Sequence, residues 1–188
     1  MNPPKMDDEA DGRERGEWQS KYTDPVARRW IRIESAYLAI LLIIAPSAML
    51  ALWLGYPQYW LQLSDQKYRT LFLWGLAWIA GTFGGTLFDI KWLYRSVARQ
   101  FWHMDRRPWR FFTPHISGGL AFIVIALISS GLVQVFDRHA IESPSLVLGV
   151  AFLAGYFADS TLAKLAEIAH TLFGQSTGKK DISEKKDA

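Results

Sequence analysis

The sequence predicts an all-α membrane protein with four transmembrane helices and a C-terminal cytoplasmic amphipathic helix. Charged residues are concentrated toward the two ends of the 188-residue chain, and the middle holds long stretches almost free of charge. The chain also contains 9 Trp, 7 Tyr and 11 Phe residues, and aromatic rings collect where hydrocarbon meets headgroups. The basic residues between the apolar stretches alternate between abundant and scarce, as they do in multi-pass proteins.

The first 27 residues are expected to form a disordered cytoplasmic tail. Residues 1–27 mix acidic and basic side chains with few aliphatic ones, so they cannot bury enough apolar surface to fold alone. No secretory signal pattern is visible there, and the first span should therefore be retained. A transmembrane domain is predicted over 28–173, beginning with an aromatic and basic collar around Trp30 that suits anionic headgroups.

Four apolar stretches define the spans, which are predicted at about residues 35–54, 70–90, 116–136 and 144–164. A helix of about 20 residues matches a hydrocarbon core of roughly 30 Å. The fourth stretch is short before it meets Asp159, so its helix must continue to Lys164 to complete the crossing. A post-membrane amphipathic helix then runs to Phe173, and residues 174–188 form a lysine-rich disordered tail.

The connecting segments predict the orientation. Basic residues are abundant before the first span, between Lys91 and Pro114, and in the C-terminal tail, and they are scarce at 55–69 and 137–143. By the positive-inside rule, both termini and the central connection lie in the cytoplasm. We therefore expect a multi-pass protein of the cell inner (plasma) membrane.

Two features could join helices together. Gly81 and Gly85 form a G-x-x-x-G pattern, which allows two helix backbones to touch. They could serve self-association into a homo-oligomer, or internal packing against the small residues of the third span. The post-membrane helix presents a second apolar face, whose members are Leu162, Leu165, Ala169 and Leu172.

A charged cluster is predicted at the cytoplasmic ends of the spans, formed by Glu34, Asp89, Lys91, Arg95 and Asp159. Ionisable groups near hydrocarbon are costly, so they usually pair or line a wet cavity. One hypothesis is a belt of interfacial ion pairs that holds the bundle. The sharper hypothesis is that Asp89 and Asp159 line a cation-attracting opening at the cytoplasmic mouth.

The central connection interleaves basic and aromatic residues, namely Trp102, Arg106, Arg107, Trp109 and Arg110. Such a pattern occurs both at membrane surfaces and in nucleic-acid grooves. Because both flanks enter the bilayer within a few residues, lipid headgroups are the expected partner and nucleic acid is not. A phosphate-bearing ligand or a cytoplasmic protein partner remains the alternative.

Nothing in the sequence predicts an enzyme. There are no cysteines, the four histidines are isolated, and no zinc-protease or phosphate-cradling motif occurs, so no metal or cofactor is expected. Ser129 and Ser130 lie in the third span without a histidine at matching depth, which argues against an intramembrane hydrolase.

The segment from Gly155 to Phe173 resembles the end of several small bacterial four-span membrane proteins of uncertain role. Some of these are encoded beside antiviral defence systems, where such proteins are thought to damage membranes. The resemblance covers about twenty residues and the general four-span plan, and it implies no functional residue.

Three functions are consistent with these patterns. The first is a self-assembling protein that alters membrane permeability, as an effector or channel-like pore. The alternative is a non-catalytic membrane anchor or scaffold that recruits a cytoplasmic partner protein. A transporter subunit with a site at mid-membrane is a second alternative, suggested only by Pro46 and the serines of the third span.

Overall fold

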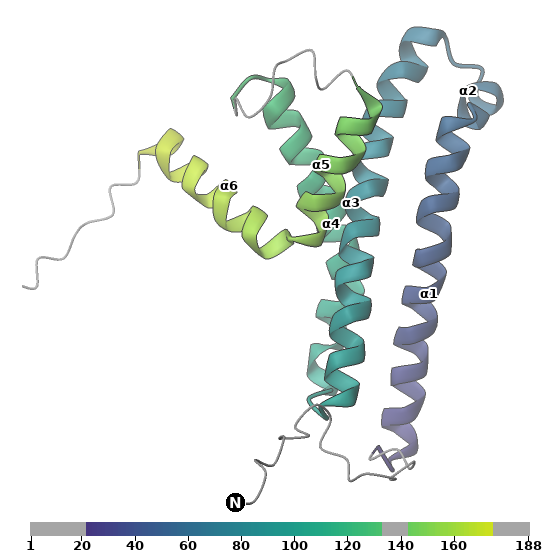
Figure 1. Ribbon diagram of the computed structural model, residues 1–188, viewed down its shortest axis with the longest axis vertical. Helices are drawn as coiled ribbons and strands as arrows, with labels where there is room; N and C mark the ends of the chain where they lie inside the picture. Colours follow the sequence, from purple (N-terminus) through teal and green to yellow (C-terminus); the bar gives the residue numbers. More distant parts are fainter. Residues whose placement is uncertain (1–21, 133–142, 175–188) are drawn as a thin grey trace, which may run out of the picture.

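The structure, a computed structural model, describes residues 22–132 and 143–174, and every regular element in them is helical. The elements are α1 (Pro25–Trp53), α2 (Tyr56–Leu61), α3 (Asp65–Ala98), the short 3-10 helix η1 (Met104–Arg106), α4 (Arg107–Ser129), α5 (Pro144–Tyr156) and α6 (Ala158–Phe173). Figure 1 shows α1, α3 and α4 along the long axis, α5 beside the upper part of the bundle, and α6 leaving it sideways.

Three helices, α1, α3 and α4, are long and apolar enough to cross a membrane. The pair α5 and α6 meets the same test only when taken together, and it is bent by 98° at the break between them. The predicted fold class is thus confirmed as all-α with three to four helices able to cross. By helix length and composition, the chain is a multi-pass membrane protein.

The helices begin and end at different residues from those predicted. α1 starts at Pro25, where the Asp24 side chain accepts a hydrogen bond from the Val26 backbone N–H at 3.0 Å, so the predicted disordered segment 1–27 is wrong at its end. Residues 1–21 and 175–188 lie outside the described part of the chain. α3 has 34 residues and is about 51 Å long, well beyond the roughly 30 Å of hydrocarbon.

The third span was predicted at 116–136, but α4 runs from Arg107 to Ser129. Pro108 stands in the first turn of α4, where a missing backbone N–H costs nothing, and this allows the helix to begin within the basic segment. The central connection between Lys91 and Pro114 is therefore mostly helical, and only residues 99–106 join α3 to α4. Residues 133–136 lie outside the described part of the chain.

The fourth span does not continue to Lys164 as one helix. α5 ends at Tyr156 after 13 residues, about 20 Å, and α6 begins at Ala158 in a new direction. The Thr161 hydroxyl donates to the Ala154 carbonyl at 3.0 Å, which satisfies a group that the break would leave without a partner. Gly155 lies against the Gly81 backbone, so α5 is held tightly to α3 just before the chain turns.

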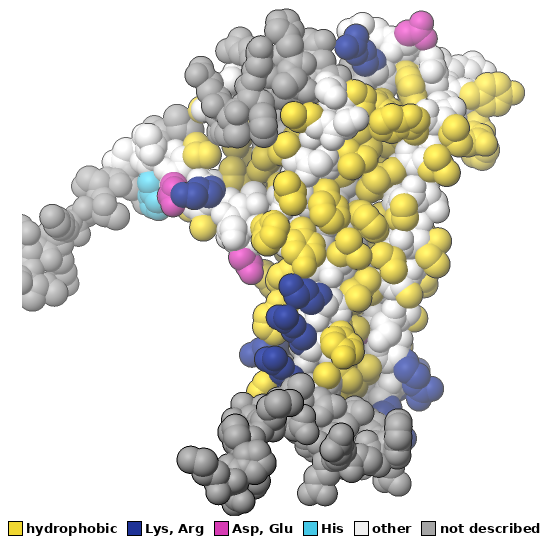
Figure 2. Space-filling model, viewed as in Figure 1, with side chains coloured by type: hydrophobic (Ala, Val, Ile, Leu, Met, Phe, Trp, Pro, Cys, Tyr) yellow, Lys and Arg dark blue, Asp and Glu magenta, His cyan; other side chains and the backbone are white. Residues whose placement is uncertain are grey.

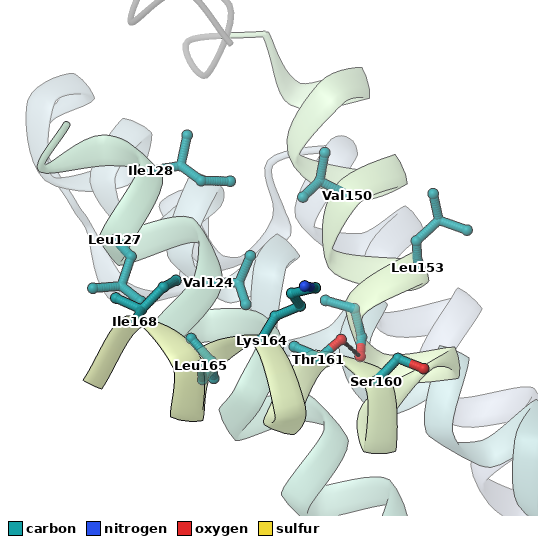
Figure 3. A pocket seen from close by; sticks show the side chains of 11 residues that line it. Val124, Leu127, Ile128, Val150, Leu153, Ser160, Thr161, Lys164, Leu165 and Ile168 are labelled. Carbon is teal, nitrogen blue, oxygen red and sulfur yellow. Dashed lines mark hydrogen bonds between the residues drawn. The ribbon is translucent and has the colours of Figure 1, made fainter. Parts of the chain in front are cut away.

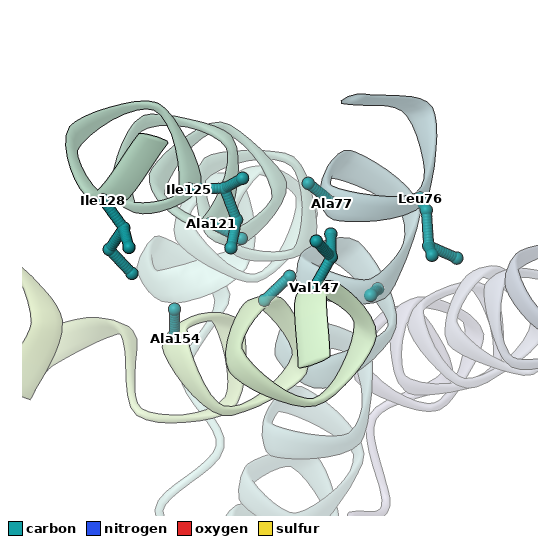
Figure 4. Close-up of a cluster of buried hydrophobic side chains, with 9 residues drawn as sticks. Leu76, Ala77, Ala121, Ile125, Ile128, Val147 and Ala154 are labelled. Carbon is teal, nitrogen blue, oxygen red and sulfur yellow. The ribbon is translucent and has the colours of Figure 1, made fainter. Parts of the chain in front are cut away.

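Small residues bring α3, α4 and α5 into close contact. The apolar core, shown in Figure 4, lies between these helices and is made by Leu76, Ala77, Ala80, Ala121, Ile125, Ile128, Val147, Ala151 and Ala154. An added Cβ at Gly81 or Gly85 would lie closer than 3.0 Å to atoms of α4, and one at Gly84 would overlap α5. Backbones this close leave no room for larger side chains.

The outer surface matches a hydrocarbon environment. Large apolar side chains of α1 are exposed along its middle, among them Ile40, Ile43 and Leu50. Figure 2 shows hydrophobic side chains over the middle of the visible face and several Lys and Arg side chains near its lower end. We call this lower end, where α1 starts, α3 ends and α4 starts, the basic end. At the opposite end, Tyr59 and Trp60 of α2 are 83% and 81% exposed, as interfacial aromatic residues would be.

Candidate functional site

A buried ion pair between Glu34 and Arg110 lies at the basic end. The Glu34 side chain on α1 is 2% exposed, and the Arg110 guanidinium on α4 donates to it through Nε at 2.9 Å and through a terminal nitrogen at 3.3 Å. The Trp102 indole N–H donates to the same carboxylate at 2.9 Å. One acid therefore joins α1, α4 and the connection before α4, and we call this group the Glu34 cluster.

Further contacts extend the Glu34 cluster. The Arg107 guanidinium lies 3.7 Å from Glu34 and 3.1 Å from the centre of the Trp30 ring, a cation–π contact. The same terminal nitrogen of Arg110 also donates to the His103 carbonyl at 3.1 Å. The Tyr22 hydroxyl accepts from the Trp102 backbone N–H at 3.3 Å. These contacts fix the 99–106 connection against the helices.

A cavity of about 330 Å³ opens beside this cluster. Its lining comes from α3, η1, α4 and the start of α6, and consists of Phe88, Asp89, Trp92, Ser96, Arg106, Trp109, Arg110 and Asp159. The structure thus brings Asp89 and Asp159 into one cavity, as the sharper sequence hypothesis required. Two tryptophan side chains and two arginines line it with them.

Asp89 is the most unusual member of this lining. Its side chain is 2% exposed, and its Oδ2 atom has no hydrogen-bond partner in the structure. Buried carboxylate oxygens are normally paired, because leaving one without a partner costs free energy. Asp159 and Arg106 are exposed, so the lining runs from a buried acid to charged groups at the rim.

The bases predicted for the charged cluster do not pair with its acids in the described residues. The Lys91 ammonium lies 5.8 Å from the centre of the Tyr156 ring and donates to its hydroxyl at 3.4 Å, which links α3 to α5. Arg95 is exposed on α3. Ion pairs do hold the basic end together, but their positively charged partners are Arg107 and Arg110.

The structure divides the residues predicted for a membrane-surface or partner loop. Trp102 and Arg110 are buried, at 6% and 7% exposure, and belong to the interior of the protein. Arg107 is half-buried beside Trp30. Only Arg106 and Trp109 remain exposed, and both line the cavity. No sequence pattern indicates the pairing of Glu34, because its partners Trp102 and Arg110 lie 68 and 76 residues away.

The predicted association residues have mixed positions. Gly81 and Gly85 are buried against α4, which is the internal packing alternative. On α6, Leu165 and Ala169 are half-buried, Leu162 is 44% exposed, and the Leu172 side chain lies outside the described part of the chain. Figure 3 shows Leu165 and Ile168 pointing toward Val124 and Leu127 of α4, across an apolar groove of about 420 Å³.

The residues that suggested a transporter site, Pro46, Ser129 and Ser130, do not form one in the structure. Pro46 is exposed on the surface of α1. The Ser129 hydroxyl donates to the Ile125 carbonyl of its own helix at 2.7 Å, and Ser130 bonds in the same way to Leu127 at 2.9 Å. None of the three contributes to a polar site at mid-membrane.

Within residues 22–132 and 143–174, no three His, Cys, Asp or Glu side chains come together as ligands of a metal ion would. No protein family, curated protein or solved structure matches the chain. The function must therefore be inferred from the geometry of the basic end.

Proposed function

We propose that this protein is a non-catalytic membrane scaffold whose basic end holds a fixed surface for a cytoplasmic partner protein. The proposal depends on the Glu34 cluster. A single buried carboxylate receives hydrogen bonds from Trp102 and Arg110, and it thereby orders the connection between two membrane-crossing helices. An ordered connection presents its exposed side chains in one arrangement, which favours recognition because less entropy is lost on binding.

The surface itself is formed by Phe101, Met104 and Arg106. Phe101 is 62% exposed, Met104 is 41% exposed, and the exposed Arg106 lies in the same short helix, η1, as Met104. Exposed aromatic, methionine and arginine residues are enriched at protein interfaces. These residues lie in the connection beyond the ends of α3 and α4, where they are less suited to contact hydrocarbon than the side chains of α1.

The scaffold requires the basic end to face the cytoplasm, as the distribution of basic residues predicts. The chain has no cysteines, so single cysteines can be labelled specifically. A Met104→Cys variant should react with a membrane-impermeant thiol reagent only after the cells are permeabilised. Tyr59→Cys, at the other end, should react in intact cells. The reverse pattern would contradict the orientation and the scaffold with it.

Photocrosslinking tests for the partner. A photoreactive benzoylphenylalanine is placed at Phe101, and the control carries it at Ile43, which is 67% exposed in the middle of α1. The scaffold predicts a discrete protein adduct from position 101 only, and its loss when Glu34→Gln is added at equal protein level. Protein adducts at neither position, or an adduct that Glu34→Gln leaves unchanged, would argue against it.

A permeability role is the second candidate, because Asp89 and Asp159 share one cavity. The α3–α4–α5 core is packed with apolar side chains, so a polar path would have to form between copies of the chain. This candidate predicts that the purified protein makes vesicles leak ions, and that Asp89→Asn with Asp159→Asn abolishes the leak. Intact vesicles at high protein density would exclude it.

A further inference from the structure

We propose that the cavity at Asp89 binds the headgroup of a zwitterionic phospholipid that ends in a primary ammonium, such as an ethanolamine phospholipid. The inference concerns a site that shares Arg106 with the proposed partner surface, and it does not require that surface to have a partner. Four properties of the lining support it, namely a buried acid, aromatic walls, a cation at the rim, and its place at the end of the apolar helices.

The buried acid favours a cation. Asp89 is 98% buried, and its Oδ2 atom has no hydrogen-bond partner within residues 22–132 and 143–174, although Arg110 lines the same cavity. The hydrogen bonds of Arg110 go to Glu34 and to the His103 carbonyl. Nε and one terminal nitrogen of Arg110 are therefore directed at other acceptors, and Asp89 retains an oxygen without a partner. A primary ammonium carries three donors and a positive charge, which suits such a carboxylate.

The walls of the cavity suit the same group. Trp92 and Trp109 face the cavity from α3 and α4, and indole rings attract ammonium cations through their π face. Asp159, the second residue of α6, adds a second carboxylate at the rim. Two acids and two tryptophans around one space form an environment that stabilises a cationic group.

The rim also carries the counterpart for a phosphate. Arg106 is exposed and lines the cavity, and no ion pair to it is present in the described part of the chain. A guanidinium binds phosphate oxygens through a planar fork of donors. With Glu34 paired to Arg107 and Arg110, the cluster and the cavity contain three acids and three arginines. This neutral balance favours a zwitterionic ligand over one with a net charge.

The position of the cavity favours a lipid over a soluble amine. Trp92 and Trp109 are 48% and 57% exposed, so they belong to the outer surface as well as to the cavity. Exposed tryptophans at the end of apolar helices mark the headgroup level. A phospholipid in the bilayer can therefore present its headgroup at the cavity while its acyl chains stay against the apolar surface above.

Native mass spectrometry of the purified full-length protein can test this proposal. Ethanolamine, choline and glycerol phospholipids with matched acyl chains are added at equal concentration. The ethanolamine lipid should bind preferentially. Asp89→Asn should weaken its binding by about tenfold or more, the loss expected for one charge-assisted hydrogen bond. The matched control, Glu167→Gln, changes an exposed carboxylate outside the cavity and should bind as the wild type does.

Further arms keep the test decisive if Asp89→Asn fails to fold. Arg106→Gln alters an exposed side chain and should weaken the binding of the ethanolamine lipid. Free phosphoethanolamine, added in excess, should fail to displace the lipid. Equal binding of all three lipids by the wild type would overturn the proposal. Full displacement by phosphoethanolamine would overturn the lipid assignment in favour of a soluble amine.

Discussion

Removal of the Glu34 carboxylate should destabilise the protein more than any change to an exposed charge. In Glu34→Ala the Arg110 guanidinium loses both hydrogen bonds to the acid and keeps only the His103 carbonyl, and the Trp102 indole N–H loses its acceptor. Removing one partner of a buried ion pair costs about 3–5 kcal/mol. We expect a loss of that size in the free energy of unfolding.

The assay is reversible unfolding of the purified protein in mixed micelles with increasing denaturing detergent, followed by tryptophan fluorescence. The control is Glu167→Gln, whose ion pair with Lys164 is exposed on both sides. Exposed pairs contribute about 0–1 kcal/mol, so this control should unfold almost as the wild type does. A loss below about 1 kcal/mol for Glu34→Ala would refute the reasoning, because the arginine would then not depend on its partner.

A double variant separates the ion pair from general damage to the fold. Glu34→Leu with Arg110→Met replaces both charges by apolar groups, and such replacements of buried pairs are often neutral or stabilising. The double variant should therefore unfold closer to the wild type than either single change does. If the losses in the free energy of unfolding of the two single variants simply add in the double variant, Glu34 and Arg110 are not coupled and do not stabilise the fold as a pair.

Two further predictions concern helix packing and the environment of α6. Gly155→Ala should disrupt folding, because its Cβ would overlap the Gly81 backbone. Gly149→Ala should be tolerated, since nothing lies within 4 Å of the added atom. Expression level and thermal unfolding measure both variants, and equal behaviour of the two would contradict the close packing of α5 on α3. A spin label at Ile168, which lines the apolar groove between α6 and α4, should be accessible to oxygen in liposomes. One at the exposed Glu167 should be accessible to a water-soluble relaxation agent, and equal accessibility would contradict an α6 with one apolar and one hydrated face.

The long helices could be predicted from the sequence because their cause is local. Hydrocarbon requires about 20 apolar residues in a row, and that requirement is visible without knowledge of any contact. Their ends could not be predicted as well. The apolar pattern ends at the first charged residues, yet α3 continues past Asp89 to Ala98, and α4 starts at Arg107, where Arg107 and Arg110 lie within ion-pair distance of Glu34.

The bend after α5 depends on contacts that no local pattern reveals. Residues 144–173 read as one helical segment with good helix formers on both sides of Phe157. The chain turns where Gly155 meets Gly81, a residue far away in sequence, and where Thr161 satisfies the Ala154 carbonyl. The G-x-x-x-G pattern is typical of close helix contact, and Gly81 and Gly85 lie against α4. Whether that contact is internal or between copies depends on neighbours that the pattern does not specify.

The charges at the basic end were predicted as a group, but their pairing follows from the fold. Acids at the span ends and bases nearby were both visible, and Lys91 and Arg95 were the closest bases in sequence to Asp89. Their side chains are exposed, however, and the partners of Glu34 come from the next helix. A buried acid selects arginine because its planar fork can satisfy both carboxylate oxygens at once.

This selection explains why one acid at the basic end is satisfied and another is not. Glu34 receives hydrogen bonds from Trp102 and Arg110 and lies 3.7 Å from the Arg107 guanidinium, whereas Asp89 in the adjacent cavity keeps an oxygen without a partner among the described residues. If only stability mattered, replacing such a residue with an apolar one would make the fold more stable. Asp89 is costly within the bundle, and it lies beside aromatic walls and an exposed guanidinium. A ligand that completes its hydrogen bonds explains such an acid better than packing alone does.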